Sequence, residues 1–182
     1  MYKVEVGDAV KNLINDVVTL KKNGDDIGVL NRLEGICKNS GAIADSLSHI
    51  ETDEELLYID DEVSVFYLAT TPNIIYPPHE HGMEAISAIY KGSETHIFYD
   101  REGDNVVERS KVRFKAPAVV DMTVQTVHAI VNEDDEPNEN IHFYFGNLES
   151  QKRTLWDMDG KNPQQYIQED YDNFARNINN YL

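Results

Sequence analysis

Cysteine, positive charge and long apolar runs are all scarce in this chain of 182 residues. Cys37 is its only cysteine, which excludes an intrachain disulfide and favours a reducing, cytoplasmic location. Lys and Arg number 16 against 33 Asp and Glu, and the net charge of −17 disfavours binding to nucleic-acid phosphates. No apolar run approaches the roughly 20 residues that span a bilayer, and residues 1–8 lack an apolar signal-peptide core. We therefore expect a cytoplasmic protein that binds neither nucleic acid nor membrane.

The length and a hydrophobic content of 41% predict a single domain over residues 1–182, in three parts. Residues 1–50 form a predicted helical cap. Asp8 is the expected N-cap of a first helix that ends at Gly24, and Asp26 is the expected N-cap of a second. Apolar residues recur at helical spacing in both helices: Val10, Leu13, Ile14, Val17 and Leu20, then Ile27, Leu30, Leu33 and Cys37.

Short strands and turns fill residues 56–148. Turn residues such as Lys91-Gly92 separate the apolar runs, and Asp60-Asp61 marks a hairpin. Many short strands at this spacing predict an all-β sandwich or barrel. The predicted strands cover residues 56–59, 63–69, 85–90, 95–99, 105–108, 119–122, 124–131 and 141–145.

Residues 149–182 form a predicted C-terminal extension that contains a helix. Asn162 can cap this helix, and Pro163 suits its first position. One apolar face of the helix would pack against the barrel, and it comprises Ile167, Tyr171, Phe174 and Ile178.

A pair of histidines is the strongest chemical signal in the chain. His79 and His81 are spaced i and i+2, so both imidazoles would lie on one face of an extended strand, where they can clamp one transition-metal ion. A mononuclear site needs at least a third ligand. His128 is the best candidate on a predicted strand, and His96 and His142 compete with it.

These residues resemble the two-part motif of the cupin superfamily. The matching residues are Pro78-His79-x-His81, then Gly92, then His128-x-x-x-Asn132, and the likeness covers residues 50–160. The chain is most similar to the cysteine-dioxygenase-like branch, through the stretches 77–83, 90–92 and 142–148 and through Trp156-Asp157. The resemblance implies a mainly β fold, the cupin double-stranded β-helix or jelly-roll barrel, with N-terminal helices. It also implies a mononuclear metal, often ferrous iron, bound by His79, His81 and His128.

The chain departs from the general cupin motif at the Glu ligand, where Ala85 and Ile86 stand instead. Glu84 lies one position too early, although it stays open as a fourth ligand. A site of three neutral histidines is the better expectation, and it would leave coordination positions for substrate and dioxygen. The preferred metal is Fe(II), with Zn, Ni or Mn as alternatives.

A second departure concerns the substrate. The thiol dioxygenases that this chain resembles often hold the substrate carboxylate with an Arg on a strand before the His pair, but no Lys or Arg occurs between Asn39 and Tyr90. Ile86 also replaces the Cys that cross-links to Tyr in the animal enzymes. Cysteine itself is therefore not the expected substrate.

Asn140, His142 and Tyr144 alternate along one predicted strand and should point the same way. The matching strand of the thiol dioxygenases carries Ser, His and Tyr in a hydrogen-bonded line towards the iron. The resemblance thus implies that Tyr144 donates a hydrogen bond to substrate or oxygen and that His142 orients it. The alternative is that Tyr144 is an aromatic residue of the barrel core.

The functional prediction is a non-haem Fe(II) oxygenase that acts with dioxygen on a small molecule, such as a thiol. A metal-dependent isomerase or lyase of the same fold is one alternative, and a cupin that only binds a small molecule is another. A homodimer is an expectation at the level of the family.

Overall fold

The computed structural model describes residues 1–180. None of the helices in this range is long and apolar enough to cross a membrane. The helices are α1 (Asp8–Lys22), α2 (Asp26–Cys37), α3 (Ser40–Leu47), α4 (Gln168–Phe174) and the 3-10 helix Ile178–Asn180. The strands are β1 (Glu54–Ile59), β2 (Ser64–Thr70), β3 (Ile74–Ile75), β4 (His79–Glu80), β5 (Ala85–Lys91), β6 (Ser93–Glu102), β7 (Asn105–Lys115), β8 (Ala118–Met122), β9 (Val127–Asn132), β10 (Asn138–Tyr144), β11 (Thr154–Leu155), β12 (Gln164–Gln165) and β13 (Arg176–Asn177).

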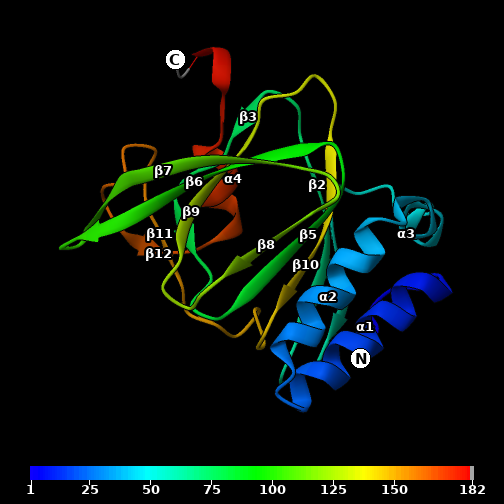
Figure 1. The fold of residues 1–182 in the computed structure, drawn as a ribbon. Helices are drawn as coiled ribbons and strands as arrows, with labels where there is room; N and C mark the ends of the chain where they lie inside the picture. Colours follow the sequence, from blue (N-terminus) through cyan, green and yellow to red (C-terminus); the bar gives the residue numbers. More distant parts are fainter. Residues whose placement is uncertain (181–182) are drawn as a thin grey trace.

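The strands pair in a nested order along the chain (Figure 1). β2 pairs with β10, β4 with β9, β5 with β8 and β6 with β7, all antiparallel. β10 also pairs with β5, and β9 with β6, which gives two sheets that face each other. This is the strand order of a jelly roll. The double-stranded β-helix predicted from the sequence is confirmed.

One sheet is buried on both faces, and alternate residues of its strands serve different cores. On β10, Ile141 and Phe143 pack with the helices, whereas His142 and Tyr144 point to the barrel interior. β5 follows the same alternation, because Ile86, Ala88 and Tyr90 join the core shared with the helices. Because side chains alternate along a strand, one face of β10 packs against the helices and the other face points to the barrel interior.

The N-terminal helices cover the outer face of this sheet (Figure 1). Leu13 of α1 and Leu33 of α2 are fully buried there. The predicted helices exist, but their N-caps lie one residue earlier than expected. Asp25 caps α2 by accepting a hydrogen bond from the Gly28 amide, and Gly7 stands at the N-cap of α1.

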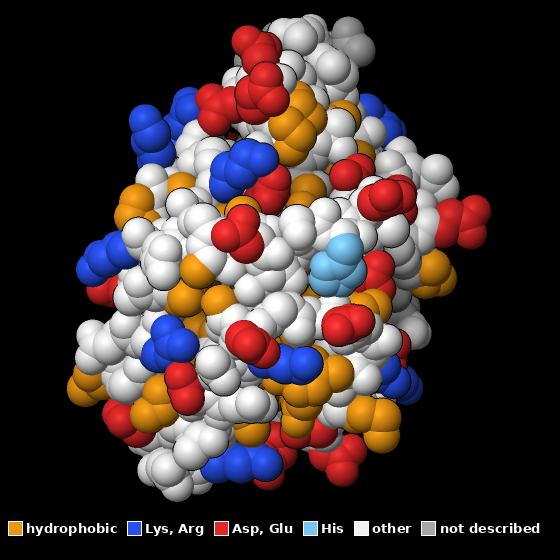
Figure 2. Space-filling model, turned by 90° about the vertical axis from the view of Figure 1, so that its right-hand side faces the viewer, with side chains coloured by type: hydrophobic (Ala, Val, Ile, Leu, Met, Phe, Trp, Pro, Cys, Tyr) orange, Lys and Arg blue, Asp and Glu red, His pale blue; other side chains and the backbone are white. Residues whose placement is uncertain are grey.

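Acidic and basic side chains intermingle on the face shown in Figure 2, with apolar side chains scattered between them. Lys21 of α1 joins this helix to its neighbours, because its ammonium group pairs with Asp26 at 2.8 Å and with Glu84 at 2.7 Å. Such exposed pairs contribute at most about 1 kcal/mol each. The apolar core, rather than surface charge, therefore holds the cap on the barrel.

The C-terminal extension differs from the prediction. Asn162 does not cap a helix: its φ is +52°, and its amide bonds the Asp157 carboxylate at 2.6 Å. Asp157 also accepts hydrogen bonds from the backbone amides of Asp159 and Lys161, which fold residues 157–161 into a tight turn. After this turn the chain runs back as β12, which pairs with β11 before α4 begins. Of the predicted apolar face, Ile178 lies beyond α4, and Ile167 is 54% exposed.

The length of β7 also differs from the prediction. It extends to Lys115, well beyond the predicted end at residue 108, and pairs with β6 along its length. Most of its side chains are exposed, so no run of apolar residues marked its second half.

We predict that Leu13→Ala lowers the free energy of unfolding by about 2–5 kcal/mol, because it empties space in a fully packed core. Denaturant unfolding followed by circular dichroism would measure this in a single transition, as expected when the cap and the barrel form one domain. Ile27→Ala is the control, since Ile27 is 74% exposed. Two separate transitions would contradict the single-domain prediction.

Candidate metal centre

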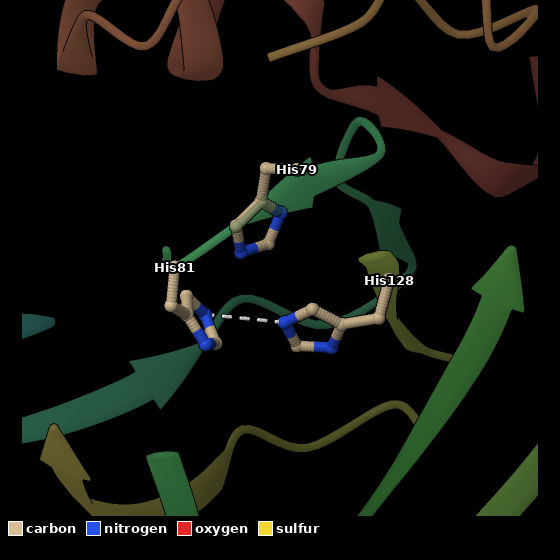
Figure 3. A group of neighbouring side chains, drawn as sticks. All are labelled: His79, His81 and His128. Carbon is tan, nitrogen blue, oxygen red and sulfur yellow. Dashed lines mark hydrogen bonds between the residues drawn. The ribbon is translucent and has the colours of Figure 1, made fainter. Parts of the chain in front are cut away.

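His79, His81 and His128 converge in the barrel interior (Figure 3). His79 lies on β4, His81 is the first residue after this strand, and His128 lies on β9. Antiparallel pairing sets His79 opposite His128, so the register of two strands positions two of the three rings. One nitrogen of each ring lies within 4.8 Å of the others, and all three residues are buried. The group predicted from the sequence is therefore assembled in the fold and could bind a metal.

The ring nitrogens of the three histidines can offer lone pairs to one cation. The Nδ1 of His79 donates to the carbonyl oxygen of Pro77 at 3.1 Å, which leaves its Nε2 lone pair free. The Nε2 atoms of His81 and His128 lie 3.3 Å apart. Two nitrogens bound tetrahedrally at about 2.0–2.1 Å to one ion are separated by roughly 3.3–3.4 Å. The separation of this pair, and the imidazole nature of all three donors, suit a divalent transition metal.

Burial keeps these imidazoles neutral, which is the form that ligates metals. Loss of hydration lowers the pKa of His79 to about 3. The same cause holds the pKa values of His81 and His128 well below their usual range. At neutral pH all three rings offer a lone pair without first losing a proton.

Glu84 does not complete the group. Its carboxylate pairs with Lys21, and its side chain is 53% exposed. Ala85 and Ile86, which stand at the Glu position of the general motif, carry no ligand atom in their side chains. Among residues 1–180, the donors gathered at this place are three imidazoles and no carboxylate.

His96 is the residue whose place the sequence did not reveal. The sequence makes it a competitor of His128 for the third ligand position, but it lies outside the group of three, with its Nδ1 3.0 Å from the Nδ1 of His128. Its Nε2 lies 2.7 Å from a carboxylate oxygen of Glu94. All three residues are 1% exposed or less. The i, i+2 spacing of Glu94 and His96 on β6 is the one sequence signal that would have placed both on a single face.

His142 and Tyr144 form a second polar pair beside the three histidines. The Tyr144 hydroxyl lies 2.9 Å from the Nδ1 of His142, and its ring packs edge-on against His81 at 5.0 Å between ring centroids. Burial raises the pKa of Tyr144 and lowers the pKa of His142 to about 4, so both groups are neutral at pH 7. The Nε2 of His142 is buried and has no partner within residues 1–180.

A cavity of about 380 Å³ adjoins these groups and is the size of a small-molecule site. The C-terminal extension forms one of its walls. Tyr171 stacks on Tyr76 at 5.1 Å and meets the ring of His79 edge-on at 5.0 Å. Arg153 also lines the cavity, with its guanidinium 3.6 Å from the ring centre of Tyr166. The barrel thus supplies the histidines, and the extension supplies a cation.

No protein-family model and no curated protein matches this chain. Among solved structures, DMSP lyase DddQ from Ruegeria pomeroyi DSS-3 is 21% identical over 58% of this chain and 48% of its own, with a TM-score of 0.45. An RmlC-like cupin family protein from Methanocaldococcus jannaschii is 16% identical over 54% of this chain and 86% of its own, with a TM-score of 0.45. Oxalate decarboxylase from Bacillus subtilis is 15% identical over 48% of this chain and 22% of its own, with a TM-score of 0.41. The chain thus spans about half of the lyase, and the fold assignment rests on its own strand pairing.

We predict that His81→Gln lowers the affinity for Co²⁺ by more than about 100-fold, since losing even an outer partner of a ligand costs roughly 10–100-fold. Competition with a chromophoric chelator would measure the affinity. His49→Gln is the matched control, because His49 is exposed and bonds the carbonyl oxygen of Glu5. Equal affinities of the His81 variant and the unchanged protein would contradict the site.

Proposed function

We propose that this protein is a metal-dependent enzyme that acts on a small molecule, and that the reaction is an oxygenation supported by Fe(II). The observation that carries the proposal is the ligand set: three buried, neutral imidazoles beside a cavity, with no carboxylate among them. Neutral ligands leave a divalent ion its full charge. Three protein ligands also leave positions open for substrate and dioxygen.

A ferrous ion held by His79, His81 and His128 would supply the redox chemistry that dioxygen needs. The residues around the site would do the rest. Burial of the three rings excludes bulk water from their side of the cavity. The hydrogen bond from His79 to Pro77 keeps its ring orientation constant through the reaction.

The His142–Tyr144 pair always has one unused hydrogen-bond donor. A neutral imidazole carries one N–H and a phenol carries one O–H, and the single bond between them uses only one of these. If His142 donates, the Tyr144 hydroxyl is free to donate. If Tyr144 donates, the His142 Nε2–H is free. Both side chains line the cavity, so either arrangement can hold a substrate atom or stabilise a developing negative charge there.

Arg153 gives the cavity the cation that is missing from residues 39–90. Its position follows from strand pairing: Leu155 of β11 lies opposite His79 of β4, and Arg153 directly precedes β11. Stacking on Tyr166 orients the guanidinium, and no carboxylate of residues 1–180 forms an ion pair with it. An anionic group of the substrate would find its partner here.

Oxygen consumption tests the proposal directly. Protein purified without oxygen and loaded with Fe(II) should consume dioxygen when supplied with one member of a panel of small thiols and small carboxylic acids. Loading with Zn²⁺ should abolish the uptake. Turnover that needs no dioxygen would instead favour the isomerase or lyase alternative, and tight binding without any turnover would favour a binding protein.

We predict that Tyr144→Phe lowers kcat by about 10²-fold or more while the metal affinity stays within about twofold, because the change removes one donor at the reacting atoms but no metal ligand. Steady-state oxygen uptake and metal competition would measure the two quantities. Tyr67→Phe removes the same hydroxyl from a buried Tyr on the helix-facing side of the sheet, and should retain kcat. An equal loss in both variants would contradict the role of Tyr144.

We predict that Arg153→Gln raises KM for an anionic substrate by about 10–100-fold, the equivalent of one hydrogen bond to a charged group. The loss should be smaller for an uncharged analogue of that substrate. Arg109→Gln is the control, since Arg109 is exposed and contacts Asp100 outside the cavity. A KM that is unchanged in the Arg153 variant would exclude this anchor.

A further inference from the structure

A buried carboxylate is connected to the metal centre through two imidazoles. Glu94 accepts from His96 at 2.7 Å, and His96 meets His128 at 3.0 Å through their Nδ1 atoms. We name Glu94, His96 and His128 the carboxylate relay. His96 lies outside the group of three candidate ligands. Any buried imidazole needs partners for its ring nitrogens, so what distinguishes His96 is their identity: a carboxylate on one side and a candidate metal ligand on the other.

The identity of the partners decides where the protons lie in a metal-loaded centre. A carboxylate can only accept, so the Nε2 of His96 donates to Glu94. The remaining nitrogen of a neutral His96 must then accept, and the Nδ1–H of His128 donates to it. The Nε2 of His128 is left with a lone pair, and this is the atom that faces His81.

We propose that Glu94 is a positioning residue of the metal centre, which acts through His96 to hold His128 in its ligating tautomer and to strengthen it as a donor. The proposal rests on metal binding by the three histidines. A negative charge at the far end of the relay pulls the Nδ1 proton of His128 towards His96 and leaves more electron density on Nε2. A site of neutral ligands thereby receives part of a negative charge without a fourth ligand.

The surroundings of Glu94 are built to keep its carboxylate ionised and fixed. One of its oxygens accepts from His96, and the other accepts from the Asn140 amide at 3.1 Å. The second oxygen also lies 3.1 Å from the Thr70 hydroxyl, which shares its single proton with the Oδ1 of Asn138 at 2.7 Å. Burial alone would raise the pKa of Glu94, but the hydrogen bond from His96, electrostatic interactions with His96 and His142, and the hydrogen bond from Thr70 outweigh it, and the pKa is lowered. The other carboxylates that line the cavity, Asp53, Glu54 and Asp172, are exposed. Glu94 is the one placed inside, at 1% exposure.

The charge of Glu94 can be removed with little change of shape. Glu94→Gln keeps an oxygen that accepts from His96. Asn140 can turn its Oδ1, which is buried without a partner, towards the new amide. We expect the affinity for Co²⁺ to fall by about 10-fold or more, within the roughly 10–100-fold range for partners of metal ligands. His96→Phe breaks the relay and should lose at least as much.

Glu84→Gln is the matched control, because it makes the same chemical change at an exposed carboxylate paired with Lys21. Its Co²⁺ affinity should stay within about twofold of the unchanged protein. If the unchanged protein binds Co²⁺ and Glu94→Gln binds it equally well, the relay is overturned while the metal site stands. If the unchanged protein binds no Co²⁺, both the metal site and the carboxylate relay are overturned.

A measurement on the unchanged sequence avoids any doubt about the folding of variants. Two-bond correlation of ring protons with ¹⁵N in protein loaded with diamagnetic Zn²⁺ reports which nitrogen of each imidazole carries a proton. We expect a protonated Nδ1 and a ligated Nε2 for His128, and a protonated Nε2 for His96. A His96 protonated at Nδ1 alone would overturn the relay.

Discussion

Antiparallel pairing of β4 with β9 is the constraint on which the candidate site depends. It sets His79 opposite His128. His81 directly follows β4 and therefore meets His128 too, although the two residues are 47 positions apart in the sequence. This pairing is one of the nested pairs of the jelly roll, so the site forms when the barrel closes. Gly82, at a φ of +68°, lets the chain turn away directly after the second ligand.

The alternation of side chains along a strand connects this chemistry to stability. The outward residues of β5 and β10 share a core with α1 and α2. On the inward side, His142 and Tyr144 of β10 line the cavity, and Ala85 and Ile89 of β5 join a second apolar cluster. The helical cap thereby fixes the strands that carry His142 and Tyr144 without touching the reacting groups. A rigid scaffold of this kind is what a preorganised site requires, because small displacements of its polar groups are costly.

Burial and charge are distributed unevenly around the three histidines. Loss of hydration keeps the rings neutral, whereas Glu94 stays ionised because hydrogen bonds from His96 and Thr70 and electrostatic interactions with His96 and His142 lower the pKa of its carboxyl group. Arg153 adds a positive charge from the C-terminal extension on the cavity side. A metal ion would therefore have a negative group behind one ligand, and a substrate would have a positive group beside it.

From the sequence alone, apolar periodicity and turn residues predict the helical cap and an all-β barrel, because both are local signals. His79 and His81 are also a local pair, whereas His128, 47 residues further on, is assigned through the resemblance to the cupin motif. The sequence misplaced the C-terminal helix, where side chains of Asp157 and Asn162 make a turn that periodicity does not report. It assigned no role to Glu94 or Arg153, and it offered His96 only as a competitor for the third ligand position. Their roles depend on which strands become neighbours: β6 beside β9, and β11 beside β4. Only the tertiary structure decides such contacts, because residues distant in sequence meet through strand register.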